Sequence, residues 1–176
     1  ARMKVYGVTG WKNSGKTGLM ERLVAEITVR GFAVSTVKHA HHVTDVDQPG
    51  RDSHRHRLAG AREVMLASPR RWALMAELRD APEPDLDSLI ARMTPVDLLL
   101  IEGYKQGAHP KVEVWRAVNG RAPLALENIT VQALASDQPL PDVPLPRFDL
   151  DDTRAIADFI LDAVGLPRAG PDGGTA

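Results

Sequence analysis

The sequence predicts an α/β fold, with three layers built around a mainly parallel sheet and one inserted antiparallel hairpin. Apolar segments with strand character alternate along the chain with segments whose apolar residues recur at helical spacing. Residues 96–103 are almost uninterrupted aliphatic, as expected of a strand covered on both faces. A glycine-rich loop at residues 10–17 separates the first strand from the first helix, where open parallel sheets bind ligands.

The first part of the chain predicts a β-loop-α unit followed by a second strand. Residues 4–8 are a short apolar run, and residues 16–30 repeat apolar side chains at helical spacing up to Gly31, a residue suited to end a helix. Residues 33–38 have the β-branched content of a strand. A short polar helix is expected over residues 51–59.

The middle of the chain interrupts this alternation. Residues 63–67 and 71–78 predict two strands joined by a tight turn at residues 68–70, which together form an antiparallel hairpin at one edge of the sheet. The next helix is expected over residues 86–93, because one helical face carries the apolar side chains of Leu86, Leu89, Ile90 and Met93.

Residues 96–103 belong in the centre of the sheet, and further strands are expected at 111–115 and 131–136. A closing helix over 154–164 has capping residues before it at Asp151, Asp152 and Thr153. From Gly165 the chain is rich in glycine and proline, so residues 165–176 predict a disordered tail. One domain over residues 1–164 is the resulting prediction.

Composition limits the possible functions. The chain has 176 residues, 43% of them hydrophobic, which suffices for one substantial core. Its 22 basic and 23 acidic residues give a net charge of -1, so no bulk attraction for nucleic acid or an anionic membrane is expected. With no cysteine, a thiolate metal site is excluded. No membrane-length apolar run and no secretion signal is visible, and a cytoplasmic location is expected.

The glycine-rich loop carries the first chemical motif. Residues 10–17 read G-W-K-N-S-G-K-T, which matches G-x-x-x-x-G-K-[ST] between a strand and a helix. Backbone N–H groups of such a loop surround phosphate oxygens, Lys16 is placed to reach the β- and γ-phosphates, and the hydroxyl of Thr17 is a Mg²⁺ ligand. The sequence therefore predicts the three-layer P-loop NTPase fold and a nucleotide site.

A second chemical element follows the central strand. Glu102 ends the aliphatic run at the same sheet edge as Thr17, where a carboxylate can hold a Mg²⁺-bound water or orient an attacking one. Gly103 lets the backbone approach a terminal phosphate. A strand-capping glutamate in solvent is the alternative. Asp97, at the opposite end of the strand, is expected to be structural.

The third element is the polar loop at residues 38–53, which contains three histidines and several acids. Imidazole and carboxylate groups suit a transition metal, so a metal site is one interpretation. A switch-like segment that meets anionic ligand oxygens is the favoured one. The third interpretation is a solvated loop that binds no ligand. The residues expected near a ligand are Lys38, His39, His41, His42, Asp52 and Ser53.

Seven motifs together resemble the molybdopterin-guanine dinucleotide biosynthesis B (MobB) proteins, a family of P-loop GTPases. Besides the loop at 10–17, the strings are V-K-H-A-H-H at 37–42, D-V-D-Q-P-G-R-D-S at 45–53, A-G-A at 59–61, A-S-P-R-R-W-A-L-M at 67–75, L-I-E-G-Y-K at 100–105 and A-S-D at 135–137. The resemblance runs from about residue 4 to about residue 164.

The resemblance implies a GTP-binding adaptor with weak GTPase activity. It would act beside the molybdenum cofactor guanylyltransferase, which joins GMP to molybdopterin. It also implies a homodimer whose contact involves the hairpin at residues 67–78. The nucleotide-binding residues it implies are Gly10, Asn13, Ser14, Gly15, Lys16, Thr17 and Gly103, with Lys16 and Glu102 catalytic and Thr17 and Glu102 holding Mg²⁺.

The sequence departs from related P-loop proteins at several positions, one of which is Gly18, where many phosphate loops carry a second hydroxyl residue. The guanine-reading string Asn-Lys-x-Asp is absent, and Asp137, after the strand at 131–136, is the nearest functional analogue. Lys12 stands one place away from the lysine that related dimeric ATPases extend across their interface, because Trp11 holds that position. A lysine finger across the dimer is therefore not expected.

Two other classes share the phosphate loop. A small-molecule kinase would add an arginine-rich lid and an acid that deprotonates the acceptor, whereas here only Arg70 and Arg71 stand together in a predicted turn. A metal-delivery GTPase would use the histidine loop, but its metal motifs normally contain cysteine. Acceptor-dependent turnover or stoichiometric binding of zinc or nickel would identify these alternatives.

Overall fold

The structure of the protein is a computed structural model that describes residues 3–41 and 46–172. Contacts within the chain divide it into two compact units. The first consists of Ala1–His39 and Thr94–Ala176, and the second of Ala40–Met93. The single domain over residues 1–164 that the sequence suggests stays a prediction.

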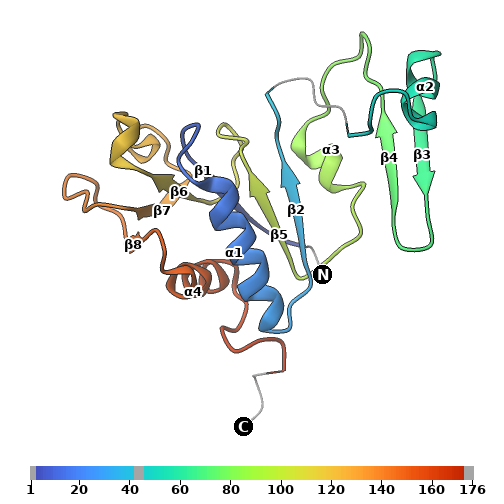
Figure 1. The fold of residues 1–176 in the computed structure, drawn as a ribbon. Coiled ribbons are helices and arrows are strands. Elements are labelled where there is room, and N and C mark those ends of the chain that lie inside the picture. Colours follow the sequence, from blue (N-terminus) through green and yellow to red (C-terminus); the bar gives the residue numbers. More distant parts are fainter. Residues whose placement is uncertain (1–2, 42–45, 173–176) are drawn as a thin grey trace. The chain divides into compact units, whose positions relative to one another are not determined.

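A six-stranded sheet organises the first unit (Figure 1). Every pairing between neighbouring strands in it is parallel. In spatial order the strands are β2 (Val34–Lys38), β5 (Leu98–Glu102), β1 (Lys4–Thr9), β6 (Lys111–Trp115), β7 (Val131–Ser136) and β8 (Arg147–Asp149). The strand order reverses at β1, so the crevice beyond its carboxyl end is the expected ligand position.

The aliphatic run at residues 98–102 is buried at every position, which confirms that β5 is central. Two helices pack against each other and against this sheet, α1 (Lys16–Val29) and α4 (Thr153–Val164) (Figure 1). Their inward side chains, including Leu19, Leu23, Ile156 and Ile160, form the core with the apolar residues of β1, β5 and β6. This core anchors the start of α1 beside the end of β1.

The second unit contains α2 (Asp52–Leu58), β3 (Glu63–Ala67), β4 (Trp72–Ala76) and α3 (Leu86–Ile90). β3 and β4 form the expected antiparallel hairpin. They make a separate two-stranded sheet, so the expectation that the hairpin joins an edge of the parallel sheet is wrong for the described residues. Helix α3 is shorter than predicted, and none of its residues is fully buried.

Three short elements were not predicted from the sequence patterns. These are strand β8 and two 3-10 helices, η1 (Ala117–Asn119) and η2 (Leu124–Leu126). Each spans only three residues, too few to show a period. The class of fold is nevertheless the predicted one, a mainly parallel sheet with helices and one antiparallel hairpin.

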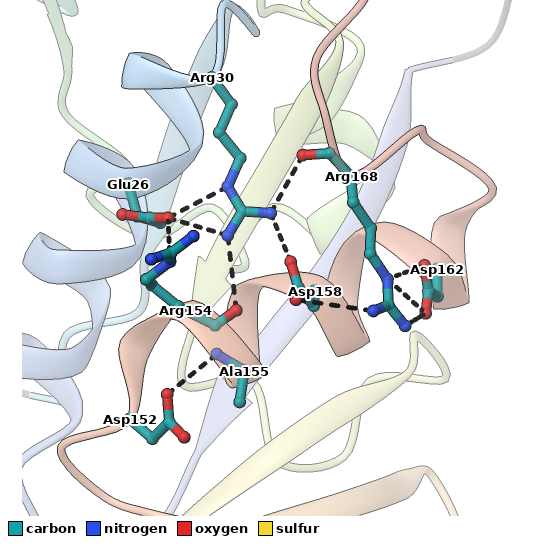
Figure 2. Close-up of polar contacts among 8 residues, drawn as sticks. All are labelled: Glu26, Arg30, Asp152, Arg154, Ala155, Asp158, Asp162 and Arg168. Atoms are coloured by element: carbon teal, nitrogen blue, oxygen red, sulfur yellow. Dashed lines mark hydrogen bonds and ion pairs between the residues drawn. The ribbon is translucent and has the colours of Figure 1, made fainter. Parts of the chain in front are cut away.

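The segment after α4 contacts the rest of the first unit as far as it is described. Arg30, at the end of α1, bonds with Glu26 at 2.8 Å, with Asp158 at 2.5 Å and with the carbonyl oxygen of Arg168 at 3.1 Å (Figure 2). Leu166 packs against the core. These contacts would offset part of the cost of ordering residues 165–172. The disordered tail over residues 165–176 stays a prediction.

Candidate nucleotide site

Backbone conformations at three residues shape the loop between β1 and α1. Gly10, Asn13 and Gly15 have φ angles of 151°, 62° and 97°. A Cβ atom on Gly10 would lie 2.4 Å from the carbonyl oxygen of Val114, so that position admits only glycine. Gly15 is the N-cap of α1. The loop therefore ends where backbone N–H groups and the helix dipole favour an anion.

Ser14 lies on the inner side of this loop. Its side chain is buried, and its Oγ has no hydrogen-bond partner among the described residues. A Cβ atom on Gly10 would lie 2.7 Å from that oxygen, which shows that the hydroxyl faces the loop itself. Any contact of Ser14 with a ligand is therefore expected through its backbone.

The side chain of Lys16 closes back over the loop. Its Nζ donates to the carbonyl oxygens of Gly10 at 3.0 Å and Trp11 at 2.8 Å. Burial lowers the pKa of this ammonium group, and the nearby positive charge of Lys105 lowers it further, while Glu102 opposes the change. An anion on the loop would remove the cost of holding these cations together.

Thr17 and Glu102 meet at the carboxyl edge of the sheet. The hydroxyl of Thr17 donates to Oε1 of Glu102 at 2.9 Å, and Nζ of Lys38 lies 3.9 Å from the same oxygen. Glu102 is only 7% exposed at the end of β5. Since β2, β5 and β1 are adjacent and parallel, their carboxyl ends bring these three side chains together. Two hard oxygen donors at one point suit Mg²⁺.

His39 and Gly103 lie beside this pair. The His39 ring stacks on the ring of Tyr104, with centroids 4.6 Å apart. The backbone N–H of His39 donates to the carbonyl oxygen of Glu102 at 3.0 Å. Gly103 has a φ of 91°, and a Cβ there would lie 3.2 Å from that of His39. Close packing against His39 therefore gives Gly103 a structural reason to be glycine.

Arg116 is a site residue that motif reasoning misses. Its Nε donates to the carbonyl oxygen of Ser14 at 3.0 Å, and its guanidinium atoms lie 3.2–3.6 Å from the Cβ position of Gly15. It follows the last residue of β6, the strand beside β1. A cation directly after a strand predicted next to the phosphate loop was the available signal.

Asp137 follows β7, two strands away from β1 in the sheet. Its Oδ1 accepts a hydrogen bond from the backbone N–H of Ala117 at 3.1 Å. The carboxylate thus links the segment after β7 to η1, the 3-10 helix that follows β6. A structural role is visible here, and the role in base recognition stays a prediction.

The remaining loop residues lie in the second unit or outside the described residues. His41 and Asp52 belong to the second unit, and His42 is not described. Ser53 is buried and bonds with Asp47, which also pairs with Arg57. A role for Asp52 or Ser53 near Mg²⁺ stays a prediction.

Neither the metal interpretation nor a membrane span gains support from the described part of the chain. Within residues 3–41 and 46–172, no group of three or more His, Cys, Asp or Glu side chains is arranged to hold a metal ion. No described helix is both long and apolar enough to cross a bilayer.

Comparison with known proteins decides the family. The family model described as molybdopterin guanine dinucleotide synthesis protein B matches residues 5–137, which include the phosphate loop, Glu102 and Asp137. The chain belongs to the MobB family. The resemblance drawn from the seven motifs is thereby confirmed.

Curated relatives of this MobB chain match over most of their length. It is 38% identical over 156 residues to the molybdopterin-guanine dinucleotide biosynthesis adapter protein of Escherichia coli, covering 86% of this chain and 88% of the relative. It is 39% identical over 162 residues to the protein of the same name from Haemophilus influenzae, with coverage of 90% and 88%.

A solved structure gives the same fold. The MobB homologue from Bacillus stearothermophilus aligns with a TM-score of 0.68 at 29% identity, over 93% of this chain and 99% of that one. The parallel sheet and the hairpin of this MobB chain are therefore features of a known architecture.

Proposed function

We propose that this MobB chain is a GTP-binding adaptor with weak GTPase activity that acts in the biosynthesis of the molybdopterin guanine dinucleotide form of the molybdenum cofactor. The observation that carries the proposal is the contact between Thr17 and Glu102 at the mouth of the phosphate loop. It joins the two motif residues expected at a Mg²⁺-nucleotide site. The adapter proteins of the same family support the pathway.

The residues present fit a Mg²⁺-nucleotide. Gly10 and Gly15 leave a cradle that side chains would fill, Lys16 supplies a mobile charge, and Thr17 with Glu102 offers oxygen ligands. Mg²⁺, when bound, neutralises charge on the β- and γ-phosphate oxygens. With a nucleotide bound, Lys16 would exchange its bonds with the loop carbonyls for phosphate oxygens, and Thr17 and Glu102 would hold the metal, with Glu102 placed to orient water.

Hydrolysis by the isolated chain is expected to be slow. Arg116 donates to the loop carbonyl of Ser14, and this guanidinium would have to give up that bond to reach a γ-phosphate. A partner that supplies a cation or orients water would accelerate the reaction. The molybdenum cofactor guanylyltransferase is the proposed partner, and molybdopterin the proposed second ligand.

Guanine selectivity is assigned to Asp137. Its Oδ1 is held by the N–H of Ala117, while no bond with Oδ2 is found in the described residues. A carboxylate oxygen of this kind accepts from guanine N1 and N2, which adenine does not offer as a pair of donors. Asp137→Asn is therefore expected to reduce the preference for GTP over ATP.

Calorimetric titration with GTP and with ATP, each with Mg²⁺, tests the proposal. The variants are Lys16→Ala and, as a matched control at the exposed amino end of β1, Lys4→Ala. GTP is expected to bind at least about 10-fold more tightly than ATP, and Lys16→Ala to remove the binding while Lys4→Ala retains it.

Equal or ATP-preferring affinity would contradict the base assignment and favour the kinase alternative. Binding that survives Lys16→Ala would exclude the phosphate loop as the site. If both results are as expected, turnover measured with and without the guanylyltransferase decides whether the partner stimulates hydrolysis.

A further inference from the structure

A pocket opens beside the phosphate loop. Its lining residues come from the loop itself and from the segments after β5 and β6, and its volume is about 260 Å³. They are Trp11, Lys12, Lys105, Asn119 and Arg121. All belong to the first unit, and none was assigned a ligand from the sequence.

Three cationic side chains and one amide line the pocket beside the Trp11 ring. Nζ of Lys105 lies 4.4 Å from the centroid of the Trp11 ring, and the guanidinium carbon of Arg121 lies 4.5 Å from it. The Nδ2 of Asn119 is buried and has no hydrogen-bond partner among the described residues. An anion in the pocket would offset the repulsion among its cations and form charge-assisted hydrogen bonds with them.

The charges at this edge are not balanced. The lining includes three cations and no carboxylate. Glu113 is the acid whose charge acts on Lys105, but its two oxygens already accept from the N–H groups of Leu124 and Ala125 at 2.7 and 2.8 Å. Burial lowers the pKa of Lys16, and the nearby charge of Lys105 lowers it further. Positive charge therefore accumulates between the pocket and the loop.

We propose that this pocket binds the phosphomonoester group of a second ligand beside the nucleotide. The Trp11 ring holds Lys105 and Arg121 in place by cation–π contacts until the phosphate arrives. Lys12, which stands on the phosphate loop and is exposed, also lines the pocket. The two sites therefore share one loop.

The pocket is small for a whole ligand. Drug-sized ligand pockets span roughly 300–1,000 Å³, whereas this one measures about 260 Å³. A phosphate head group fits it, with the remainder of the ligand outside. The proposal extends the adaptor function but does not depend on GTP being the nucleotide.

Phosphate titration by calorimetry tests the pocket, with inorganic phosphate and glycerol 1-phosphate as probes. The test variant is Lys105→Gln with Arg121→Gln. The charge-matched control is Lys4→Gln with Arg154→Gln, whose side chains are exposed. Affinity for both probes is expected to fall about 10-fold or more in the test variant and to stay within about twofold in the control. The intrinsic fluorescence change on binding should disappear in Trp11→Phe.

Two further conditions separate this site from the nucleotide site. Lys16→Ala, which disables the phosphate loop, should still bind glycerol 1-phosphate, and saturation with GDP and Mg²⁺ should leave that affinity within about twofold. Loss of probe binding in Lys16→Ala, full competition by GDP, or no binding by the wild type would overturn the proposal. Absence of GTP binding with probe binding intact would instead contradict the proposed function alone. Thermal unfolding confirms that each variant is folded.

Discussion

Gly10 shows how one residue shapes the phosphate loop. Its φ of 151° and the nearby carbonyl oxygen of Val114 leave no room for a side chain. The backbone of the adjacent strand β6 thus lies directly against the loop at Gly10. A side chain at this position would displace the loop, and Ser14 and Lys16 would shift together with it. The loop is therefore held by the sheet as well as by its own sequence.

We predict that Gly10→Ala lowers the free energy of unfolding by about 2–4 kcal/mol, since a contact at 2.4 Å adds to the cost of the unusual backbone. Gly120→Ala is the matched control, because its φ is also positive but nothing lies within 4 Å of its Cβ position. Urea unfolding of both variants measures the difference. Equal losses would show that backbone conformation alone accounts for the effect.

His109 is a second residue whose environment has a measurable consequence. Its ring packs against Gly7 and Gly107, with its Nε2 buried and without a partner among the described residues. Burial, with a smaller contribution from the charge of Lys111, lowers its pKa from 6.5 to about 4. The folded state therefore holds the neutral ring in a pH range where the unfolded chain takes up a proton.

The neutral His109 ring makes the stability of the fold depend on pH. Its contribution to the free energy of unfolding is fully present above pH 6.5 and is lost as the pH falls from 6.5 toward 4, because the unfolded state then binds more protons. We predict that the Tm of His109→Gln falls less over this range than that of the wild type, by about 2–4 °C. Scanning calorimetry at several pH values measures the slope. Parallel slopes would show that His109 is not the titrating group.

At the scale of elements, Arg30 joins α1, α4 and the segment after α4. It bonds with Glu26 on its own helix, with Asp158 on α4 and with the carbonyl oxygen of Arg168 (Figure 2). Its side chain is largely buried, unlike that of Arg154, which is 86% exposed. One guanidinium therefore forms hydrogen bonds with groups from three segments. Such an arrangement contributes more to the free energy of unfolding than a single exposed ion pair does.

We predict that Arg30→Ala costs about 1–3 kcal/mol of unfolding free energy, because it leaves partly buried carboxylates without their partner. Arg154→Ala, on the same face, should cost less than about 0.5 kcal/mol. Chemical unfolding at low and at high salt measures both. A loss in Arg30→Ala no larger than in Arg154→Ala would mean that the network contributes little.

At the scale of the whole molecule, the hairpin leaves an apolar face exposed. Cross-strand pairing puts Met65 opposite Leu74 and Ala67 opposite Trp72, so Met65, Leu74 and Trp72 share one face. They are 62%, 44% and 68% exposed. Apolar surface collected on a hairpin that pairs with no further strand among the described residues is typical of a protein interface. This supports the proposed homodimer contact at residues 67–78.

We predict that the wild type sediments as a dimer and that Trp72→Ser with Leu74→Ser shifts it to a monomer, raising the dissociation constant at least about 100-fold. Ile129→Ser is the control, since Ile129 is 97% exposed but lies in the first unit. Analytical ultracentrifugation distinguishes the states. A dimer that persists in the double variant would place the contact elsewhere.

The sequence by itself determined the class of fold and the phosphate loop. The spacing of the glycines with Lys16 and Thr17 and the unbroken aliphatic run before Glu102 are local patterns, and parallel strands bring their carboxyl ends to one edge. The N-cap at Asp152 was equally local, since its side chain accepts from Ala155 three residues on. The motifs also sufficed to identify the family.

Tertiary structure alone decided the contacts between residues far apart in the chain. Arg116 reaches Ser14 across 102 positions, and the pocket gathers Trp11 with Lys105 and Arg121 through their position in the fold. The same holds for the contact between Arg30 and Arg168 and for the separate hairpin sheet. Short-range periodicity carries no information about such contacts, because they depend on which strands become neighbours and on the packing of whole side chains.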